Sequence, residues 1–255
     1  MSQQRNCAIV EVAKLNPYAI SMTMEVGDMN PQVGQFVHVK CGEGLLLRRP
    51  ISICDWQVDE PSNLLRMVFE VRGEGTEWLA GREVGESLDV LGPLGHGFTM
   101  EKGGSYLLVG GGIGVPPMLA CAKAAAGNCT AVLGFRTAER AMLLEDFNEV
   151  CTDVVVMSDD GSLGEHGYVD AGVRKVLAGG GKFDAVLACG PKAMLKSVVK
   201  AAAEFGVPCQ VSMEERMGCG VGACLVCACD MKDGSRKHVC KNGPVFNAEE
   251  VDWDA

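Results

Sequence analysis

Four cysteines near the carboxyl end of the chain have the spacing of an iron–sulfur site. They follow the pattern C-x4-C-x2-C-x12-C, and a C-x4-C-x2-C run with a distant fourth cysteine is typical of plant-type [2Fe–2S] clusters. Structural zinc also takes four cysteines, but it usually uses pairs of short C-x2-C knuckles, and this stretch has one. The predicted ligands are Cys219, Cys224, Cys227 and Cys240.

The other cysteines do not suggest a disulfide framework. The chain has 13 cysteines, and those between residues 7 and 209 stand singly, as small buried hydrophobic residues do. The total is odd, and five of the 13 cysteines lie within residues 219–240. This distribution indicates metal binding rather than the disulfide bonds of a secreted protein. Cys229 is a spare cysteine that we do not assign to the cluster.

A second candidate site is the sequence R-R-P-I-S at residues 48–52. The planar fork of an arginine matches the oxygens of a pyrophosphate, and a nearby hydroxyl can hydrogen-bond a flavin ring. Two arginines before a strand are often only solvated. The G-E-G-T turn at residues 73–76 adds weight, because glycine turns present amide groups to phosphate, although such a turn is also common at a hairpin or a helix start.

A third candidate is the glycine run at residues 110–114, followed by Val115 and two prolines. Glycines between a strand and a helix let a phosphate approach the backbone and the positive end of the helix dipole. The run is not the G-x-G-x-x-G fingerprint, because Val115 and the prolines replace the third glycine. A C-G-P sequence at residues 189–191 also follows a predicted strand, so it belongs to the same ligand-binding edge of a sheet.

The elements that must position these residues change in character along the chain. Apolar residues alternate with polar ones in six stretches separated by turn residues, which predicts an antiparallel barrel or sandwich. Strands then alternate with helices, which predicts a doubly wound parallel α/β sheet. The six stretches are 7–13, 18–26, 35–40, 51–55, 64–71 and 87–91; the later strands are 106–109, 130–134, 153–157, 183–188 and 207–213, and the helices are 116–126, 140–150, 170–177 and 191–205.

Three units are therefore expected: a barrel at residues 1–100, an α/β domain at 101–213 and a cluster-binding domain at 214–255. The last of these is too short to support a core without a metal or a neighbour. Residues 103–122 carry no charge, but their glycines and prolines predict a buried strand, a turn and a helix rather than a membrane span.

Charge and composition exclude several classes of function. The net charge of −10 argues against nucleic-acid binding, and no Lys/Arg run suggests a membrane surface. The hydrophobic content of 47% is too high for a disordered chain. The first 16 residues lack a signal-peptide pattern, which predicts a cytoplasmic protein.

Taken in order, these motifs resemble the ferredoxin–NADP reductase superfamily, and within it the electron-transfer subunits of NAD-dependent dihydroorotate dehydrogenase. The similarity covers nearly the whole chain. General members of the superfamily have Tyr or Phe where Ile51 stands, so R-P-I-S indicates the dihydroorotate subgroup. That subgroup also has its cluster domain at the carboxyl end. The most specific segments are L-R-R-P-I-S-I at 47–53, G-E-G-T at 73–76, L-G-P-L-G at 91–95 and E-E-R-M-G-C-G at 214–220.

The resemblance implies FAD between the barrel and the α/β domain, and NAD as the electron acceptor. It also implies that the four cysteines bind a [2Fe–2S] cluster. The residues implied for FAD are Arg49, Pro50, Ile51, Ser52, Val68, Phe69, Glu70, Gly75 and Thr76, and those implied for NAD are Gly111, Gly112, Gly114, Cys189, Gly190 and Pro191.

The resemblance further implies a function in pyrimidine biosynthesis. A partner subunit would oxidise dihydroorotate on FMN, and electrons would pass through the cluster and FAD to NAD⁺, with two copies of each subunit. No residue of this chain is expected to act as an acid, a base or a nucleophile, because the cofactors perform the redox chemistry. The alternatives are a reductase subunit of another electron-transfer complex and a zinc-stapled nucleotide-binding module. Arg136, which follows a predicted strand, leaves NAD or NADP open.

Overall fold

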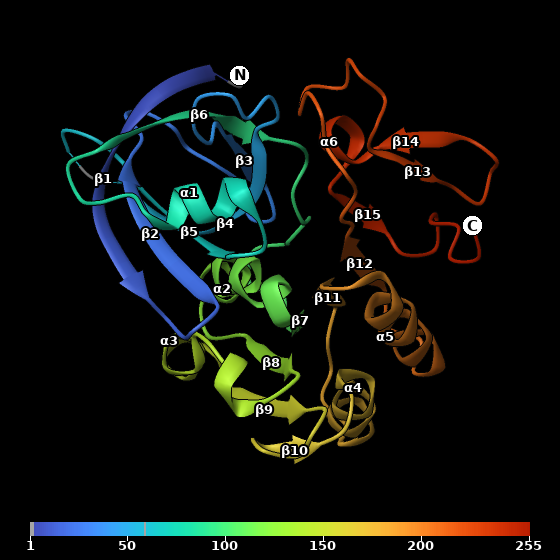
Figure 1. Cartoon of the computed structure of the whole chain (residues 1–255). Helices are drawn as coiled ribbons and strands as arrows, with labels where there is room; N and C mark the ends of the chain where they lie inside the picture. Colours follow the sequence, from blue (N-terminus) through green and yellow to red (C-terminus); the bar gives the residue numbers. More distant parts are fainter. Residues whose placement is uncertain (1–2, 59) are drawn as a thin grey trace.

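The computed structural model describes residues 3–58 and 60–255. The amino-terminal part is a closed barrel of six antiparallel strands, as predicted (Figure 1). Alternate side chains such as Ile9, Met22 and Met67 fill its interior. In barrel order the strands are β1 (Gln3–Lys14), β2 (Ala19–Glu25), β5 (Leu64–Glu70), β4 (Arg49–Gln57), β3 (Phe36–Val39) and β6 (Ser87–Leu94).

A short helix that strand periodicity did not predict lies between β5 and β6. This helix, α1 (Glu74–Ala80), starts within the G-E-G-T turn. The Thr76 hydroxyl oxygen accepts hydrogen bonds from the backbone N–H groups of Arg72 (2.8 Å) and Gly73 (3.2 Å). Thr76 therefore stabilises the entry into the helix, as helix-start hydroxyls commonly do.

The second part is a seven-stranded sheet whose first six strands are parallel. Chain order runs outward from β7 through β8 and β9, and then resumes on the other side of β7 with β11, so the switch point lies between β7 and β11. In sheet order the strands are β10 (Glu165–His166), β9 (Asp153–Ser158), β8 (Cys129–Phe135), β7 (Tyr106–Gly111), β11 (Ala185–Cys189), β12 (Cys209–Ser212) and β15 (Val245–Asn247).

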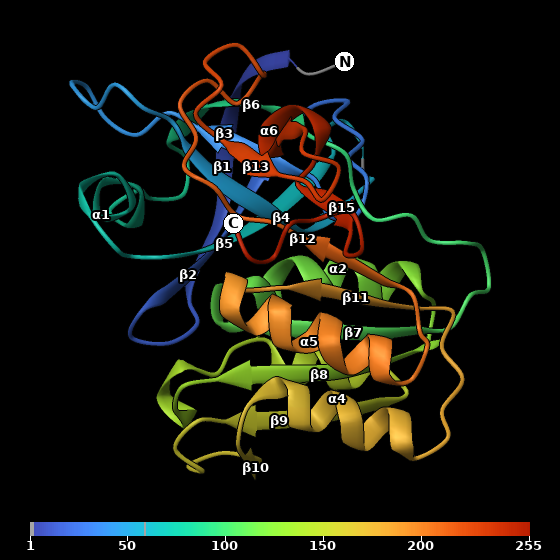
Figure 2. The ribbon, with the colours of Figure 1, turned by 90° about the vertical axis from the view of Figure 1, so that its right-hand side faces the viewer.

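Helices cover both faces of this sheet, which confirms the doubly wound prediction. The helices α4 (Val169–Ala178) and α5 (Lys192–Glu204) pack on one face, toward the viewer in Figure 2, through side chains such as Val173 and Val198. On the other face lie α2 (Val115–Ala124) and α3 (Leu144–Val150). The uncharged segment 103–122 forms β7, the 3₁₀ turn η1 (Gly112–Gly114) and most of α2, as predicted.

One predicted helix starts later than expected. The segment 140–150 was predicted to be helical throughout, but α3 begins at Leu144, after the 3₁₀ turn η2 (Ala138–Arg140). Ala141 has an extended backbone, and Leu143 has a φ of 62°, in the left-handed region that no α-helix contains.

The carboxyl-terminal segment packs onto the sheet. It contains β13 (Ala228–Asp230), β14 (Arg236–His238) and α6 (Val239–Asn242), and its last strand, β15, pairs antiparallel with β12. Its buried side chains Met231, Val239 and Phe246 belong to the same apolar core as α4 and α5. The segment that was expected to lack a core of its own therefore shares that of the α/β sheet.

Apolar packing and ion pairs hold the barrel to the α/β sheet. Val68 of β5 lies in the core that α2 contributes to, and Lys123 of α2 pairs with Asp55 of β4. Arg66 of β5 pairs with Asp146 of α3 at 2.7 Å.

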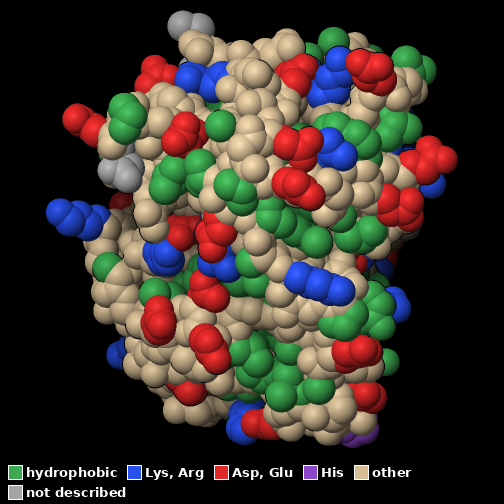
Figure 3. Space-filling model, turned by 60° about the vertical axis from the view of Figure 1, so that its left-hand side comes forward, with side chains coloured by type: hydrophobic (Ala, Val, Ile, Leu, Met, Phe, Trp, Pro, Cys, Tyr) green, Lys and Arg blue, Asp and Glu red, His purple; other side chains and the backbone are tan. Residues whose placement is uncertain are grey.

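Acidic and basic side chains are interspersed over the face drawn in Figure 3. In the described part of the chain, no helix is long and apolar enough to span a membrane.

Candidate functional site

Three of the predicted cluster cysteines, Cys219, Cys224 and Cys227, lie on a loop, and the fourth, Cys240, lies on α6. Backbone amides of the loop are directed at sulfurs of this set. Cys219 Sγ accepts hydrogen bonds from the backbone N–H groups of Val221 (3.4 Å), Ala223 (3.2 Å) and Cys224 (3.4 Å). Cys240 Sγ accepts one from Gly222 N–H at 3.1 Å. Amide donors of this kind stabilise thiolates, as an iron–sulfur site requires.

The cysteines associate in two pairs. The thiol of Cys219 lies beside that of Cys224, and the thiol of Cys227 lies beside that of Cys240. Partial burial opposes ionisation of Cys219, but the backbone donors outweigh it and lower its pKa to about 6. Burial, followed by the hydrogen bond with Cys227, raises the pKa of Cys240 to about 12. Within residues 3–58 and 60–255, no three His, Cys, Asp or Glu side chains converge on one metal-ion position.

Two glycines allow the loop to take this path. Gly220 and Gly222 have φ values of +73° and +79°, which favour glycine. A methyl group added at Gly222 would lie 2.6 Å from Lys241 Cδ, and one at Gly220 would lie 2.5 Å from His38 Nδ1. The glycines are thus required by both backbone conformation and close packing.

The two barrel arginines have different roles. Arg48 is engaged with Asp89, whose carboxylate accepts hydrogen bonds from it at 2.9 and 2.8 Å. Arg49, the first residue of β4, extends to the G-E-G-T turn: a methyl group at Gly75 would lie 2.5 Å from Arg49 Nε. The structure therefore brings the predicted Arg49 and Gly75 together.

The other predicted flavin residues point to different sides of the barrel wall, because side chains alternate along a strand. Ile51 and Phe69 are buried in the barrel core, and Val68 is buried on the opposite side of β5, toward α2. Pro50 is exposed and Ser52 is half-buried. Ile51 and Phe69 can therefore offer a ligand mainly their backbone groups.

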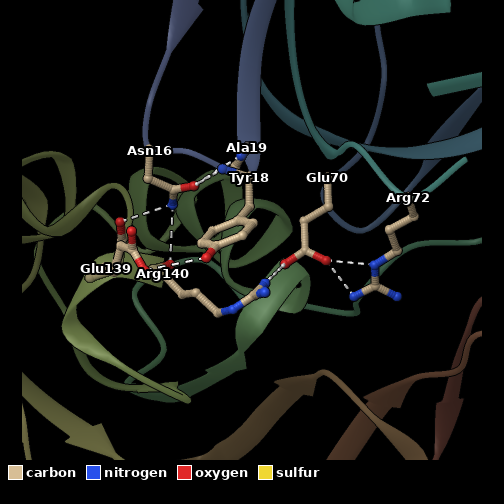
Figure 4. A network of polar contacts seen from close by, with 8 residues as sticks. Asn16, Tyr18, Ala19, Glu70, Arg72, Glu139 and Arg140 are labelled. Atoms are coloured by element: carbon tan, nitrogen blue, oxygen red, sulfur yellow. Dashed lines mark hydrogen bonds and ion pairs between the residues drawn. The ribbon is translucent and has the colours of Figure 1, made fainter. Parts of the chain in front are cut away.

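Glu70 forms part of a polar network between the barrel and η2 (Figure 4). Its carboxylate pairs with Arg72 and, at 3.8 Å, with Arg140. The Arg140 guanidinium also lies over the Tyr18 ring, 3.8 Å from its centroid. The Asn16 side chain donates to the carbonyl oxygens of Arg140 and Ala141, at 3.2 Å each. Glu70 thus has structural partners, so a flavin-contacting role for it stays a prediction.

The predicted nucleotide residues meet at the switch point of the sheet. A methyl group at Gly114 would lie 2.3 Å from the carbonyl oxygen of Cys189, and one at Gly111 would lie 3.6 Å from Pro191 Cδ. Gly112 has a φ of +54° and open space beside it, and Gly190 lies against Met194. Burial raises the pKa of Cys189 to about 12, so its thiol is neutral.

A cavity of about 520 Å³ lies where the three parts of the chain meet. The barrel contributes the strand that carries Arg49, the α/β sheet contributes Gly190 and Lys192, and the segment before Cys219 contributes the remaining wall. Lys192 and residues 214–217 were not among the predicted site residues, although residues 214–217 lie in the E-E-R-M-G-C-G segment that carries the resemblance. The lining residues are Leu47, Arg48, Arg49, Pro50, Gly190, Lys192, Leu195, Met213, Glu214, Glu215, Arg216 and Met217.

A buried histidine beside the cluster loop was also missed by sequence reasoning. The histidines stand far apart in sequence, yet His38 of β3 is fully buried against Gly220. Burial, together with the positive charge of Arg48, lowers the pKa of His38 to about 4, so the ring is neutral at pH 7.

Comparisons with known proteins agree with this architecture. Residues 108–200 match the model of the oxidoreductase NAD-binding domain, and residues 214–252 match that of the iron–sulfur cluster binding domain of dihydroorotate dehydrogenase B. A solved structure described as NADH-dependent reduced ferredoxin–NADP oxidoreductase superposes with a TM-score of 0.87 and 34% identity, over 100% of this chain and 92% of that one. A ferredoxin reductase of carbazole 1,9a-dioxygenase, at 22% identity, TM-score 0.69 and coverage of 81% and 67%, shares the fold.

The barrel, the parallel sheet and the glycine turns at its switch point define a member of the ferredoxin-reductase-like class of FAD- and NAD-binding proteins. Dihydroorotate dehydrogenase B (NAD⁺) electron transfer subunits of Bacillus cereus B4264 and Bacillus anthracis CDC 684 are each 41% identical over 266 residues, which span 98% of this chain and 99% of theirs. The chain belongs to the family of electron transfer subunits of NAD⁺-dependent dihydroorotate dehydrogenase B.

Proposed function

We propose that this chain passes electrons from a dihydroorotate-oxidising, FMN-containing catalytic subunit, through a [2Fe–2S] cluster and FAD, to NAD⁺. The observation that carries the proposal is the shared cavity. It brings the Arg49 strand, the switch point of the sheet and the approach to Cys219 to one place. An electron carrier needs its flavin, nucleotide and cluster sites within short range of one another.

The donor set supports a two-iron cluster. Two cysteine pairs, Cys219 with Cys224 and Cys227 with Cys240, suit two irons that each take two thiolates. A single structural zinc would instead need all four sulfurs around one ion. The N–H donors to Cys219 favour ionised thiolates, which are the forms that bind metal.

We place the flavin and nucleotide sites by the donor groups around the cavity that are not held by a carboxylate, as Arg48 is by Asp89. Arg49 has the geometry to hold the FAD pyrophosphate beside Gly75, whereas Arg48 stays with Asp89. The turns at Gly112 and Gly190 bring backbone to the carboxyl ends of β7 and β11, where open α/β sheets bind nucleotides.

When bound, the cluster would carry single electrons, and FAD would exchange one or two electrons, including a hydride, with NAD⁺. The chain's own residues would bind and orient these cofactors. The cysteine loop and α6 hold the four sulfurs, and the loop supplies amide dipoles. Arg49 neutralises phosphate charge, and the glycine turns permit close backbone approach. No acid or base from this chain is required.

An apolar surface beside the cluster loop suits the catalytic subunit. Val221, Leu225 and Val226 are all half or more exposed around Cys224, and Leu46 and Leu47 are exposed on the barrel loop before Arg49. Exposed apolar side chains grouped at a functional loop are typical of an interface. We place the partner here, in an assembly with two copies of each subunit and in the cytoplasm.

A second candidate is an electron-transfer subunit of another flavin-based complex. The structure that superposes over the whole chain comes from an NADH-dependent reduced ferredoxin–NADP oxidoreductase. In that case the same cofactor sites would serve a different partner and a different electron donor.

The cofactor set is tested by anaerobic purification and titration with NADH. The proposal predicts a flavoprotein with about two irons per chain, whose flavin absorbance bleaches and whose reduced cluster gives an electron paramagnetic resonance signal. A colourless chain with one zinc would contradict the redox function. Flavin reduction by NADPH but not by NADH would contradict only the choice of nucleotide.

A further inference from the structure

A fully buried histidine lies under the cluster loop without a satisfactory hydrogen bond. His38 has no solvent exposure. Its ring nitrogens face the backbone of Cys219 and Arg48, yet neither makes a hydrogen bond of normal geometry in the described part of the chain.

This arrangement is costly for folding alone. A buried polar group without a partner destabilises a protein by about 1–3 kcal/mol, whereas an apolar side chain of similar shape would be tolerated. An unsatisfied buried group in an otherwise regular strand therefore indicates a role beyond packing.

The local backbone is shaped around this ring. The pairing of β3 with β6 shifts register between Phe36 and His38, and such bulges re-aim side chains near functional sites. On the other side, Gly220 leaves no room for a side chain, since a methyl group there would lie 2.5 Å from His38 Nδ1.

His38 also lies between the two cofactor sites. In the β3–β4 ladder it pairs with Pro50, and its neighbour Val39 pairs with Arg49. The same ring faces the backbone of Cys219, whose sulfur accepts three amide hydrogen bonds. His38 thus belongs to a strand paired with the flavin strand, while its imidazole packs against the cluster loop.

We propose that His38 is a positioning residue that orients the Cys219–Gly220 backbone, keeps the amide donors of the loop on the Cys219 sulfur and thereby sets the reduction potential of the cluster. The inference rests on the proposed function, because it presupposes a cluster on the four cysteines. Through this longer polar contact, the neutral ring holds the Cys219 carbonyl toward the barrel, which leaves the following N–H groups directed at the sulfur.

The sign of the effect follows from charge. Hydrogen bonds to a thiolate ligand stabilise the reduced, more negative cluster, so they raise its potential. Without the imidazole, the Cys219–Gly220 backbone is no longer held in place, and the amide hydrogen bonds to the Cys219 sulfur lengthen. The cluster then becomes harder to reduce, while packing in the apolar surroundings of β3 is retained.

The experiment is a potentiometric titration of the cluster signal in the full chain with its cofactors. His38→Leu removes the ring N–H, His38→Asn keeps an amide N–H near the position of Nδ1, and His166→Leu is a matched control on the exposed strand β10. We expect His38→Leu to lower the equilibrium constant for cluster reduction about tenfold, which is about 59 mV for one electron. His38→Asn should recover most of the shift, and His166→Leu should show none.

The outcomes separate the inference from the proposed function. Absence of a cluster signal in the unaltered chain would refute the proposed function itself. A normal signal whose potential is the same in His38→Leu, at equal iron content, would overturn the positioning role. If His38→Leu loses its iron, His38→Asn decides: an unchanged potential supports the role, and a tenfold shift overturns it.

Discussion

At the scale of single residues, the backbone groups around each cysteine thiol decide whether it can serve as a cluster ligand. Cys219 has three amide donors on its sulfur, and this lowers the pKa of its thiol despite partial burial. Cys229 differs, because its thiol is buried and directed at the carbonyl of Asp230, and burial raises its pKa. The spare cysteine therefore lacks the surroundings of a ligand.

Replacing a ligand cysteine should remove iron, whereas replacing the spare one should not. We expect Cys224→Ser to reduce bound iron to roughly a tenth, because one iron loses a thiolate. Cys229→Ser should keep its iron and its visible absorbance. Iron and acid-labile sulfide determination on anaerobically purified protein measures both. Equal iron loss in the two variants would mean that the ligand set is wrong.

Arg49 should contribute to FAD affinity through charge. Losing a charge-assisted hydrogen bond costs about 1.5–3 kcal/mol, so Arg49→Gln should weaken FAD binding roughly 10- to 150-fold. Arg82→Gln is the control, because Arg82 stacks on Trp78 and pairs with Glu86, away from the cavity. Fluorescence titration of the flavin-free protein gives both dissociation constants. An unchanged constant for Arg49→Gln would remove this residue from the flavin site.

At the scale of elements, the cluster loop depends on glycines with positive φ. Gly222 combines a φ of +79°, contact with Lys241 and a hydrogen bond from its N–H to Cys240 Sγ. Gly234, in the β13–β14 turn, has a φ of +80° but open space around it. The two positions thus share a left-handed backbone conformation and differ in what surrounds them.

These glycines form a matched pair for substitution. Alanine at either position should lower the free energy of unfolding by about 1–2 kcal/mol through strain at positive φ. Only Gly222→Ala should also lose iron, because its methyl group displaces Lys241 and moves the amide from Cys240. Chemical denaturation and iron content test the two effects separately. Full iron retention in Gly222→Ala would show that the loop tolerates a side chain there.

The elements also show how far the sequence could predict the structure. Period-two alternation defined the barrel strands, and the two prolines that follow the glycine run marked the start of α2. The helix α1 was missed because its seven residues are too few to show periodicity. The start of α3 was misplaced because the left-handed Leu143 has no sequence signature.

At the scale of the whole molecule, the site exists only where three parts of the chain meet. Sequence spacing predicted the four cysteines and the glycine turns, because these lie in local motifs. It could not predict His38, Lys192 or residues 214–217 as site residues, since only tertiary packing brings them to the cluster loop or the cavity. The strand β15 likewise joins β12 from across the cluster segment.

The network in Figure 4 should stabilise the arrangement of the barrel and the sheet. Arg140→Ala removes both the contact with Tyr18 and the ion pair with Glu70, and we expect a loss of about 1–2 kcal/mol in unfolding free energy. Lys175→Ala removes an exposed pair with Glu165 within the α/β sheet and should cost less than about 0.5 kcal/mol. Denaturant titration compares the two. Equal effects would mean that the network contributes no more than a surface pair.

In the proposed function, this chain connects dihydroorotate oxidation to NAD⁺. The most direct test is to tag the chain in its native host, isolate its complex anaerobically and measure NADH formation on addition of dihydroorotate. We predict NADH production that requires both subunits and is lost in Cys224→Ser. A brown, flavin-containing complex that forms no NADH from dihydroorotate would contradict it and would assign the chain to another electron-transfer system.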